Sequence, residues 1–176
     1  MASTKLAAGQ TVPDITVQKL GGGEIHLPTP AENYDWRMVV VYRGKHCPLC
    51  TNYLSKLNEL VPEFNAIGID VVALSADPEE KAQAQMSDVK PDIEVGYGLT
   101  IEQMQKLGLY ISNPFSAAET DRPFSEPAVL VINEKAELQI VDMSNAPFAR
   151  PELNSMLMGL KFIRNPANNY PVRGTY

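Results

Sequence analysis

The feature that most constrains this fold is a continuous apolar run at residues 38–42, Met-Val-Val-Val-Tyr, with no polar residue between its members. Such a run is typical of a strand buried on both faces, in a sheet that helices cover. Similar runs follow at residues 69–74 and 128–132, the first of them interrupted only by Asp70. We therefore expect a central sheet between layers of helices.

Helical periodicity begins directly after residues 47–50. Leu54, Leu57, Val61 and Phe64 lie close to a 3.6-residue period, so they predict a helix with one buried stripe. Pro62 falls inside this pattern and predicts either a kink or an early end of the helix.

Three further helices are indicated by their end signals. Residues 77–80, Asp-Pro-Glu-Glu, predict a helix start with Asp77 as the capping residue. Residues 100–103 form a capping-box pattern, and Gly108 marks the end of that short helix. The last helix is expected to begin near Pro151.

Two hairpins complete the expected sheet. The glycines at 21–23 form a tight turn between alternating segments and predict a hairpin near the N-terminus. Residues 134–136 turn between the 128–132 run and a partly alternating segment at 138–141. The fold class is therefore α/β, with a central mixed sheet flanked by helices and an N-terminal β-hairpin extension.

Composition bounds the class of protein. The chain has 176 residues, a formal net charge of −6, 44% hydrophobic residues and 20% charged residues. These values predict one soluble globular domain, 1–176, with an irregular tail at 165–176, and they exclude disorder as the main state. The acidic balance argues against binding to nucleic acid, and no apolar run is long enough to span a membrane.

The two cysteines, Cys47 and Cys50, are separated by two residues. Residues 1–6 lack a signal-peptide pattern, so we expect a reducing cytoplasm, where a close pair of cysteines indicates redox or metal chemistry. A zinc site needs two more ligands, and the only histidines, His26 and His46, show no ligand spacing. No bound metal is therefore expected.

The cysteines lie where a buried strand is expected to end and a helix to begin. Free backbone N–H groups and the helix dipole favour a thiolate there, and thiolate is the reactive form of cysteine. Arg43, Lys45 and His46 supply cationic neighbours. The spacing lets Cys47 and Cys50 form an internal disulfide after one of them attacks an oxidant or a disulfide.

The segment Cys47–Cys50 after a buried strand resembles the redox motif of the thioredoxin fold. The longer stretch 40–50 is similar to the redoxin branch, which includes alkyl hydroperoxide reductase/thiol-specific antioxidant and peroxiredoxin-like proteins. Residues 71–77 and 126–132 suit the same branch. The resemblance implies that Pro127 is a cis-proline facing the cysteines.

The resemblance implies an antioxidant oxidoreductase. One thiolate would reduce a hydroperoxide, the other thiol would condense with the sulfenic acid, and a thioredoxin- or glutathione-type donor would restore the dithiol without any cofactor. It also implies a homodimer. The alternatives are a protein disulfide reductase and a redox-sensing interaction module that is not an enzyme.

The resemblance leaves the roles of the thiols open. Overlay on peroxiredoxins makes Cys50 the attacking thiol, whereas overlay on thioredoxins gives that role to Cys47. Pro127 stands where peroxiredoxins carry a peroxide-binding arginine, so Arg43 or Arg122 is the candidate substitute.

Several residues are candidates for supporting roles. His46 is expected to be exposed and to modulate the site, Pro48 belongs to the motif, and Thr51 hydrogen-bonds near the helix start or caps it. The polar loop 113–126 holds two phenylalanines that line a substrate groove or cover the core. The supporting and substrate-loop candidates are Arg43, His46, Pro48, Thr51, Arg122, Phe124, Glu126 and Pro127.

Overall fold

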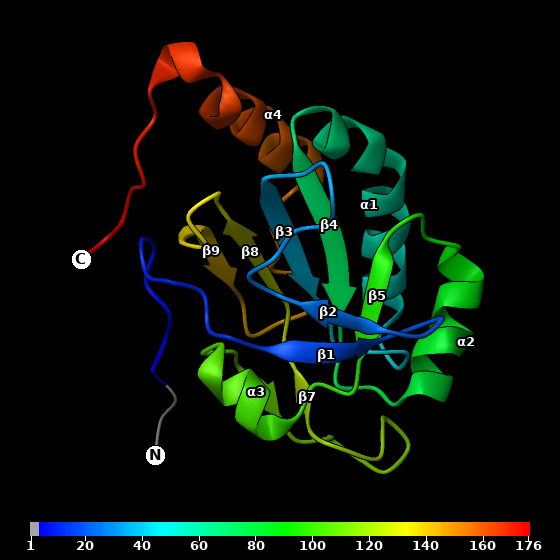
Figure 1. The fold of residues 1–176 in the computed structure, drawn as a ribbon. Coiled ribbons are helices and arrows are strands. Elements are labelled where there is room, and N and C mark those ends of the chain that lie inside the picture. The colour runs from blue at the N-terminus through cyan, green and yellow to red at the C-terminus, as the bar shows by residue number, and fades with distance from the viewer. Residues whose placement is uncertain (1–3) are drawn as a thin grey trace.

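The computed structural model describes residues 4–176, which form a seven-stranded mixed sheet with helices on both faces (Figure 1). The strand order across the sheet is β2-β1-β5-β4-β3-β8-β9. A separate two-stranded sheet pairs β6 with β7. The strands are β1 (Thr16–Lys19), β2 (Glu24–His26), β3 (Trp36–Val41), β4 (Ile69–Leu74), β5 (Glu94–Tyr97), β6 (Ile111–Ser112), β7 (Phe124–Ser125), β8 (Ala128–Ile132) and β9 (Leu138–Met143).

The sheet divides the core into two layers, and helices cover both. Helices α1, α2 and α4 pack on one face of the central strands, and α3 packs with the N-terminal hairpin on the other face. The helices are α1 (Pro48–Ala66), α2 (Glu79–Val89), α3 (Ile101–Lys106) and α4 (Leu153–Arg164), followed by the 3-10 turn η1 (Pro166–Asn168).

The central strand β3 explains why the first apolar run lacks alternation. All six of its residues are buried, because β3 pairs in parallel with β4 on one side and antiparallel with β8 on the other. Both faces of the strand are covered by apolar side chains. The expected mixed sheet is confirmed, and the end of β3 carries the chain directly into the cysteine segment.

The N-terminal hairpin and the first helix follow the sequence pattern closely. Strands β1 and β2 pair antiparallel across the glycine turn, as expected. Helix α1 buries the predicted stripe together with Cys50. It continues through Pro62 to Ala66, so the prediction of an early end is wrong. The capping box at Thr100 is confirmed, with both of its reciprocal hydrogen bonds present.

The start of α2 differs from the prediction. Pro78 occupies the N-cap position without a side-chain hydrogen bond, so Asp77 does not cap this helix. The Asp77 carboxylate instead accepts a hydrogen bond of 2.7 Å from the backbone N–H of Lys45, because it faces the cysteine segment. A carboxylate that could have stabilised a helix start therefore stabilises the loop before α1.

Two strand pairings were absent from the sequence-based expectation. Strand β5 is short and contains Gly96, which weakens its β signal, yet it pairs in parallel with β4. The expected loop 113–126 ends in β7, which pairs antiparallel with β6. The tail after α4 contains η1 and then no regular structure up to residue 176.

A buried ion pair ties the central sheet to the segment after the hairpin. The Nη2 and Nε atoms of Arg37 lie 2.6 and 2.8 Å from the same carboxylate oxygen of Asp70, across the β3–β4 pairing. Arg37 also donates to the carbonyl of His26, and Asp70 accepts from the N–H of Ala31. Both charged groups are thus neutralised and hydrogen-bonded inside the protein.

None of the helices within residues 4–176 is both long enough and apolar enough to cross a membrane.

Candidate active site

Cys47 is the residue that caps the start of α1. Its backbone is extended (φ −111°, ψ 99°), and its sulfur accepts a hydrogen bond from the backbone N–H of Cys50 at 3.3 Å. Pro48 takes the first helical position, where a missing N–H has no consequence because that group lacks a helical partner. The local sequence thus points the Cys47 sulfur at the free N–H groups of the helix.

The two cysteines have very different pKa values, because one donates a hydrogen bond to the other. The thiol of Cys50 donates a hydrogen bond to Cys47, and this is the largest cause that lowers the pKa of Cys47 to about 6. The backbone N–H of Cys50, the Arg43 side chain and the charge of Arg150 lower that pKa further, whereas burial opposes them. The same hydrogen bond, together with burial, raises the pKa of Cys50. At neutral pH Cys47 is therefore the thiolate and Cys50 is the thiol.

Both sulfurs lie inside the protein. Cys47 is 2% exposed and Cys50 is fully buried, and both belong to the core beneath α1. A small oxidant needs a slight opening to reach Cys47, whereas a protein disulfide needs the first turn of α1 to open.

Arg43 is held beside the thiolate by three partners. Its Nε lies 3.1 Å from Glu126, its Nη2 lies 3.4 Å from Glu119, and its guanidinium lies 4.7 Å from the centre of the Phe124 ring. It also hydrogen-bonds the Cys47 side chain. Arg43 therefore stands at the site as one of the two expected substitutes for the missing arginine.

Arg122, the other expected substitute, is directed elsewhere. Its Nη2 lies 2.8 Å from Asp121, and its side chain is 40% exposed. Asp121 also forms an ion pair with Lys81 of α2. Arg122 lies in the loop 113–126, and its guanidinium pairs with Asp121 rather than with the cysteines.

Arg150 is a second cation at the site, and sequence reasoning missed it. It follows β9, and its charge lowers the pKa of both Cys47 and Cys50. Its Nε donates to the carbonyl of Pro147 at 2.9 Å, and its guanidinium lies 4.6 Å from the centre of the Tyr53 ring. Its Nη1 is buried and has no hydrogen-bond partner among residues 4–176. This N–H group is free to bind a small polar ligand.

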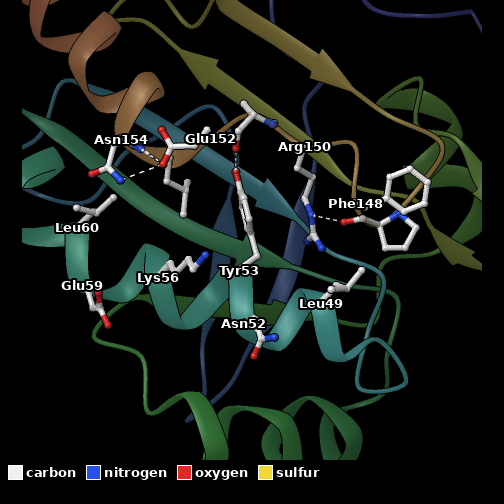
Figure 2. A pocket seen from close by; sticks show the side chains of 13 residues that line it. Leu49, Asn52, Tyr53, Lys56, Glu59, Leu60, Phe148, Arg150, Glu152 and Asn154 are labelled. Atoms are coloured by element: carbon white, nitrogen blue, oxygen red, sulfur yellow. Dashed lines mark hydrogen bonds between the residues drawn. The ribbon is translucent and has the colours of Figure 1, made fainter.

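No local signal marks Arg150, because about one hundred residues of sequence separate it from the cysteines. Only the packing of the β9–α4 connection against α1 brings it there, as Figure 2 shows for Arg150, Tyr53 and Leu49.

His46 is not exposed, contrary to expectation. It is partly buried, and its ring centre lies 4.5 Å from that of Phe124. Burial, followed by the charge of Arg43, lowers the pKa of His46, so the ring is neutral at pH 7. Both ring nitrogens are buried without a hydrogen-bond partner in the described part of the chain.

The cysteine segment is fixed from behind by α2. The Nε2 group of Gln85 donates to the carbonyl of Gly44 and to the hydroxyl of Thr51, each at 3.1 Å. Thr51 therefore hydrogen-bonds near the helix start, and it is not the cap, since Cys47 has that role. Together with the contact between Asp77 and Lys45, these bonds hold the loop in one conformation.

The prediction that Pro127 is a cis-proline is wrong. The peptide bond before Pro127 is trans, like every other one described between residues 4 and 176. The backbone on either side continues in extended pairing, because Glu126 donates to Tyr110 and Pro127 accepts from Ser144. A trans bond suits this uninterrupted path from β7 into β8.

The two phenylalanines of the loop 113–126 have different positions. Phe124 is 2% exposed and packs against Arg43 and His46, so it forms part of the wall of the site. Phe115 is 95% exposed and covers no core. Glu126 is buried and connects Arg43 to the hydroxyl of Ser112.

A groove of about 620 Å³ begins beside the cysteine segment and runs along α1 (Figure 2). Its walls come from one face of α1 and from the connection between β9 and α4. The lining residues are Leu49, Asn52, Tyr53, Lys56, Glu59, Leu60, Pro147, Phe148, Arg150, Pro151, Glu152, Leu153 and Asn154. Within residues 4–176 no group of three or more His, Cys, Asp or Glu side chains is placed to hold a metal ion.

The sheet order, the N-terminal hairpin and a pair of cysteines at the start of α1 define a thioredoxin-like fold with an N-terminal extension. Residues 8–141 match the model of the AhpC/TSA family, so the chain belongs to that family.

Curated relatives support the same grouping. The chain is similar to a probable 1-Cys peroxiredoxin of Syntrichia ruralis, at 26% identity over 140 residues, covering 76% of this chain and 63% of the relative. A 1-Cys peroxiredoxin of Medicago truncatula is 26% identical over 105 residues, covering 58% of this chain and 47% of the relative. The chain thus spans less than two-thirds of the length of these relatives.

Solved structures share the fold. A cysteine-to-serine mutant of peroxiredoxin 6 from Arenicola marina superposes with a TM-score of 0.77 at 19% identity, covering 92% of this chain and 75% of that one. A peroxiredoxin-like protein from Aquifex aeolicus gives 0.75 at 17% identity, covering 91% and 89%. AhpC of Mycobacterium tuberculosis gives 0.73 at 16% identity, covering 96% and 100%.

Proposed function

We propose that this protein is a thiol-dependent peroxidase in which Cys47 attacks a hydroperoxide and Cys50 resolves the product. The observation that carries this proposal is the lowered pKa of Cys47, about 6, at the start of α1 and beside two arginines. Membership of the AhpC/TSA family and the names of the curated relatives support the same chemistry.

The first step transfers one oxygen atom. The Cys47 thiolate attacks the nearer oxygen of the hydroperoxide, the O–O bond breaks, and Cys47 becomes a sulfenic acid. The departing oxygen leaves as alkoxide or hydroxide and takes up a proton from Cys50 or from water. Arg43 and Arg150 stabilise the negative charge as it moves from sulfur to oxygen.

The second step closes the dithiol cycle. Cys50, which has lost its proton to the oxygen that departed in the first step or to water, attacks the Cys47 sulfur, the S–O bond breaks, and the oxygen leaves as hydroxide, which takes up a proton from solvent to become water. An external thiol or dithiol then reduces the disulfide and returns both cysteines to their starting state. The relatives are named for one cysteine, so their names support an attacking cysteine, and the resolving role of Cys50 is an addition of this proposal.

Single-cysteine variants test the assignment. After one equivalent of hydrogen peroxide, Cys50→Ser should accumulate sulfenic acid at Cys47, and Cys47→Ser should not form it at Cys50. Mass spectrometry after trapping with dimedone reads out both. Sulfenic acid on Cys50 alone would reverse the roles, and peroxide consumption no faster than that of free cysteine would exclude the peroxidase.

A second candidate is a thioredoxin-like reductase of protein disulfides. The Cys-Pro-Leu-Cys motif and the presence of Pro127 in place of an arginine favour it. The burial of both sulfurs counts against it, because a protein substrate must reach Cys47 directly. Reduction of insulin disulfides without any peroxide consumption would select this candidate. The third reading, a redox-sensing module, is disfavoured by a cysteine pKa this low.

We further propose a cytoplasmic protein that works with a thioredoxin- or glutathione-type reductant and forms a homodimer. A reducing compartment keeps the dithiol available for the cycle. Sedimentation at micromolar concentration tests the dimer, and comparison of the two reductants in a turnover assay identifies the electron donor.

A further inference from the structure

A second group of reactive side chains lies at the N-terminal hairpin. The Nε2 atom of His26 lies 2.7 Å from Oδ1 of Asp14, and its Nδ1 atom lies 2.8 Å from Oγ1 of Thr29. The carbonyl of His26 is held at 2.7 Å by Arg37, which belongs to the start of β3, whereas the cysteines follow the end of that strand. The two groups of side chains are therefore anchored at opposite ends of β3.

The Asp14 carboxylate decides which ring nitrogen of His26 carries a proton. An ionised carboxylate only accepts hydrogen bonds, so Nε2 has to hold the proton that faces Asp14. In the neutral ring Nδ1 then has the lone pair, and it accepts the hydrogen bond of the Thr29 hydroxyl. A hydroxyl in contact with a base, which a third group orients, is the arrangement of an activated nucleophile.

The backbone of the hairpin holds the base and the hydroxyl in place. Both chain neighbours of His26 are buried, so its own side chain turns outward. Pro28 and Pro30 flank Thr29 and fix two φ angles of the turn. The N–H of Thr29 also donates to the carbonyl of His26 at 3.1 Å. The two reacting groups are therefore pre-organised, because little freedom remains for them to lose.

The surroundings of Thr29 favour modification over turnover. The side chains of His26 and Asp14 are 44% and 87% exposed, and Thr29 is exposed too, so a reagent can reach the hydroxyl. Residues 28–30 offer no free backbone donor to an oxyanion, because two of them are prolines and the N–H of Thr29 is already engaged. Rapid hydrolysis of an ester depends on such donors. An acyl group that reaches Thr29 should therefore stay there.

We propose that Thr29 is an acyl-acceptor site, which takes the acyl group of an activated ester or thioester. The Thr29 oxygen attacks the carbonyl carbon while His26 takes the hydroxyl proton at Nδ1. The bond from that carbon to the leaving oxygen or sulfur breaks, the leaving group departs as an anion, and His26 passes the proton to it or to water. Asp14 is a positioning residue that keeps the ring in the required tautomer. The product is an ester at Thr29, and the proposed peroxidase function is not needed for it.

Acetylation by 4-nitrophenyl acetate tests the site. After incubation, neutral hydroxylamine removes acetyl groups from cysteine but spares threonine esters, and mass spectrometry of the digested protein then locates the remaining groups. Thr29 should be acetylated about a hundredfold faster than Thr16, an exposed threonine of the same hairpin, because only Thr29 contacts the base. Equal rates at the two threonines would overturn the proposal.

Variants of the base separate activation from mere exposure. His26→Ala should bring the rate at Thr29 down to that at Thr16, and added imidazole should restore part of the difference between the two positions. Thr29→Ser, which keeps a hydroxyl, should retain the fast acetylation, whereas Thr29→Val should remove it. Undiminished acetylation of Thr29 in His26→Ala would exclude His26 as the base and with it the proposal.

Two changes at Asp14 test the positioning role. Asp14→Asn should lose most of the rate advantage of Thr29 over Thr16, because an amide can also donate and no longer dictates the tautomer of His26. Asp14→Glu keeps a carboxylate and should recover most of that advantage. Equal losses in the two variants would contradict the positioning role, since a carboxylate would then have no special effect.

Discussion

At the residue scale, the lowered pKa of Cys47 depends most strongly on a hydrogen bond between two sulfur atoms. The Cys50 thiol stabilises the Cys47 thiolate, and this bond outweighs the effect of burial, which alone would raise the pKa of Cys47. The charges of Arg43 and Arg150 act in the same sense from two different loops. A cysteine that is nearly inaccessible therefore has a lowered pKa because of the neighbours placed around it.

Replacing Cys50 by alanine should raise the pKa of Cys47 from about 6, because the strongest stabilising partner of the thiolate is lost. The absorbance of the thiolate near 240 nm, followed as a function of pH, measures this pKa. The matched control is Ser55→Ala, which alters a hydroxyl on the same helix that donates to the Thr51 carbonyl. A pKa that stays near 6 in Cys50→Ala would mean that the arginines and the backbone carry the effect.

The reactivity of Cys47 should fall with acid through pH 6. A thiolate attacks and a thiol does not, so the rate of alkylation follows the ionised fraction. Above pH 7 the rate should be nearly constant, and below pH 5 it should fall about tenfold for each pH unit. Stopped-flow alkylation with iodoacetamide between pH 4 and 9 measures this. A midpoint near 9 would contradict a stabilised thiolate.

At the element scale, the loop between β3 and α1 is fixed by contacts that its own sequence does not reveal. Gly44 has a φ of 136°, and a Cβ atom there would lie 2.8 Å from the carboxylate of Asp77. The same carboxylate holds the N–H of Lys45, and Gln85 holds the carbonyl of Gly44. The start of α2 thus shapes the start of α1.

Gly44→Ala should lower the free energy of unfolding by about 2 kcal/mol, because the alanine Cβ clashes with Asp77 and the backbone angle is strained. Urea denaturation followed by circular dichroism measures the change. Gly159→Ala is the matched control, since Gly159 is helical and nothing lies within 4 Å of its added Cβ. That variant should be neutral or more stable by up to about 1 kcal/mol. Equal stabilities for both variants would contradict the proposed clash.

At the scale of the whole molecule, the sequence patterns predicted the sheet and its layers, because buried strands produce recognisable runs of apolar residues. Runs of apolar residues predicted β3, β4 and β8, and the glycine turn predicted the hairpin β1–β2. Strand β5 was not predicted, because it is short and contains Gly96. Its pairing depends on β4 rather than on its own residues. Non-local contacts of this kind leave little trace in a local pattern.

Cys47, Cys50 and Arg43 were predictable as parts of the candidate site because these thiol and charged residues are neighbours in the chain. The roles of Arg150 and Asp77 depend on how distant segments meet, so no spacing indicated them. The prediction that His46 is exposed was wrong, because Phe124, whose ring packs against that of His46, comes from a loop far along the chain.

The pairing of Arg37 with Asp70 spans the middle of the sheet, and its loss should affect the whole fold. Asp70→Asn leaves a buried guanidinium without its counter-charge and should destabilise the protein by about 3 kcal/mol. Asp35→Asn is the control, because it breaks the more exposed pair with Arg164 and should change stability by less than about 1 kcal/mol. Urea midpoints of the two variants compare them. A similar shift in both would mean that burial adds nothing to the central pair.

The sulfur of Cys47, the proposed attacking thiol, also serves as the N-terminal cap of α1. In the proposed cycle, oxygen transfer to that sulfur removes the negative charge that the helix terminus favours, so the first turn of α1 is expected to loosen when Cys50 has to move toward Cys47. Under the same proposal, the order of one helical turn follows the redox state of Cys47, and reduction by the electron donor restores the capped turn.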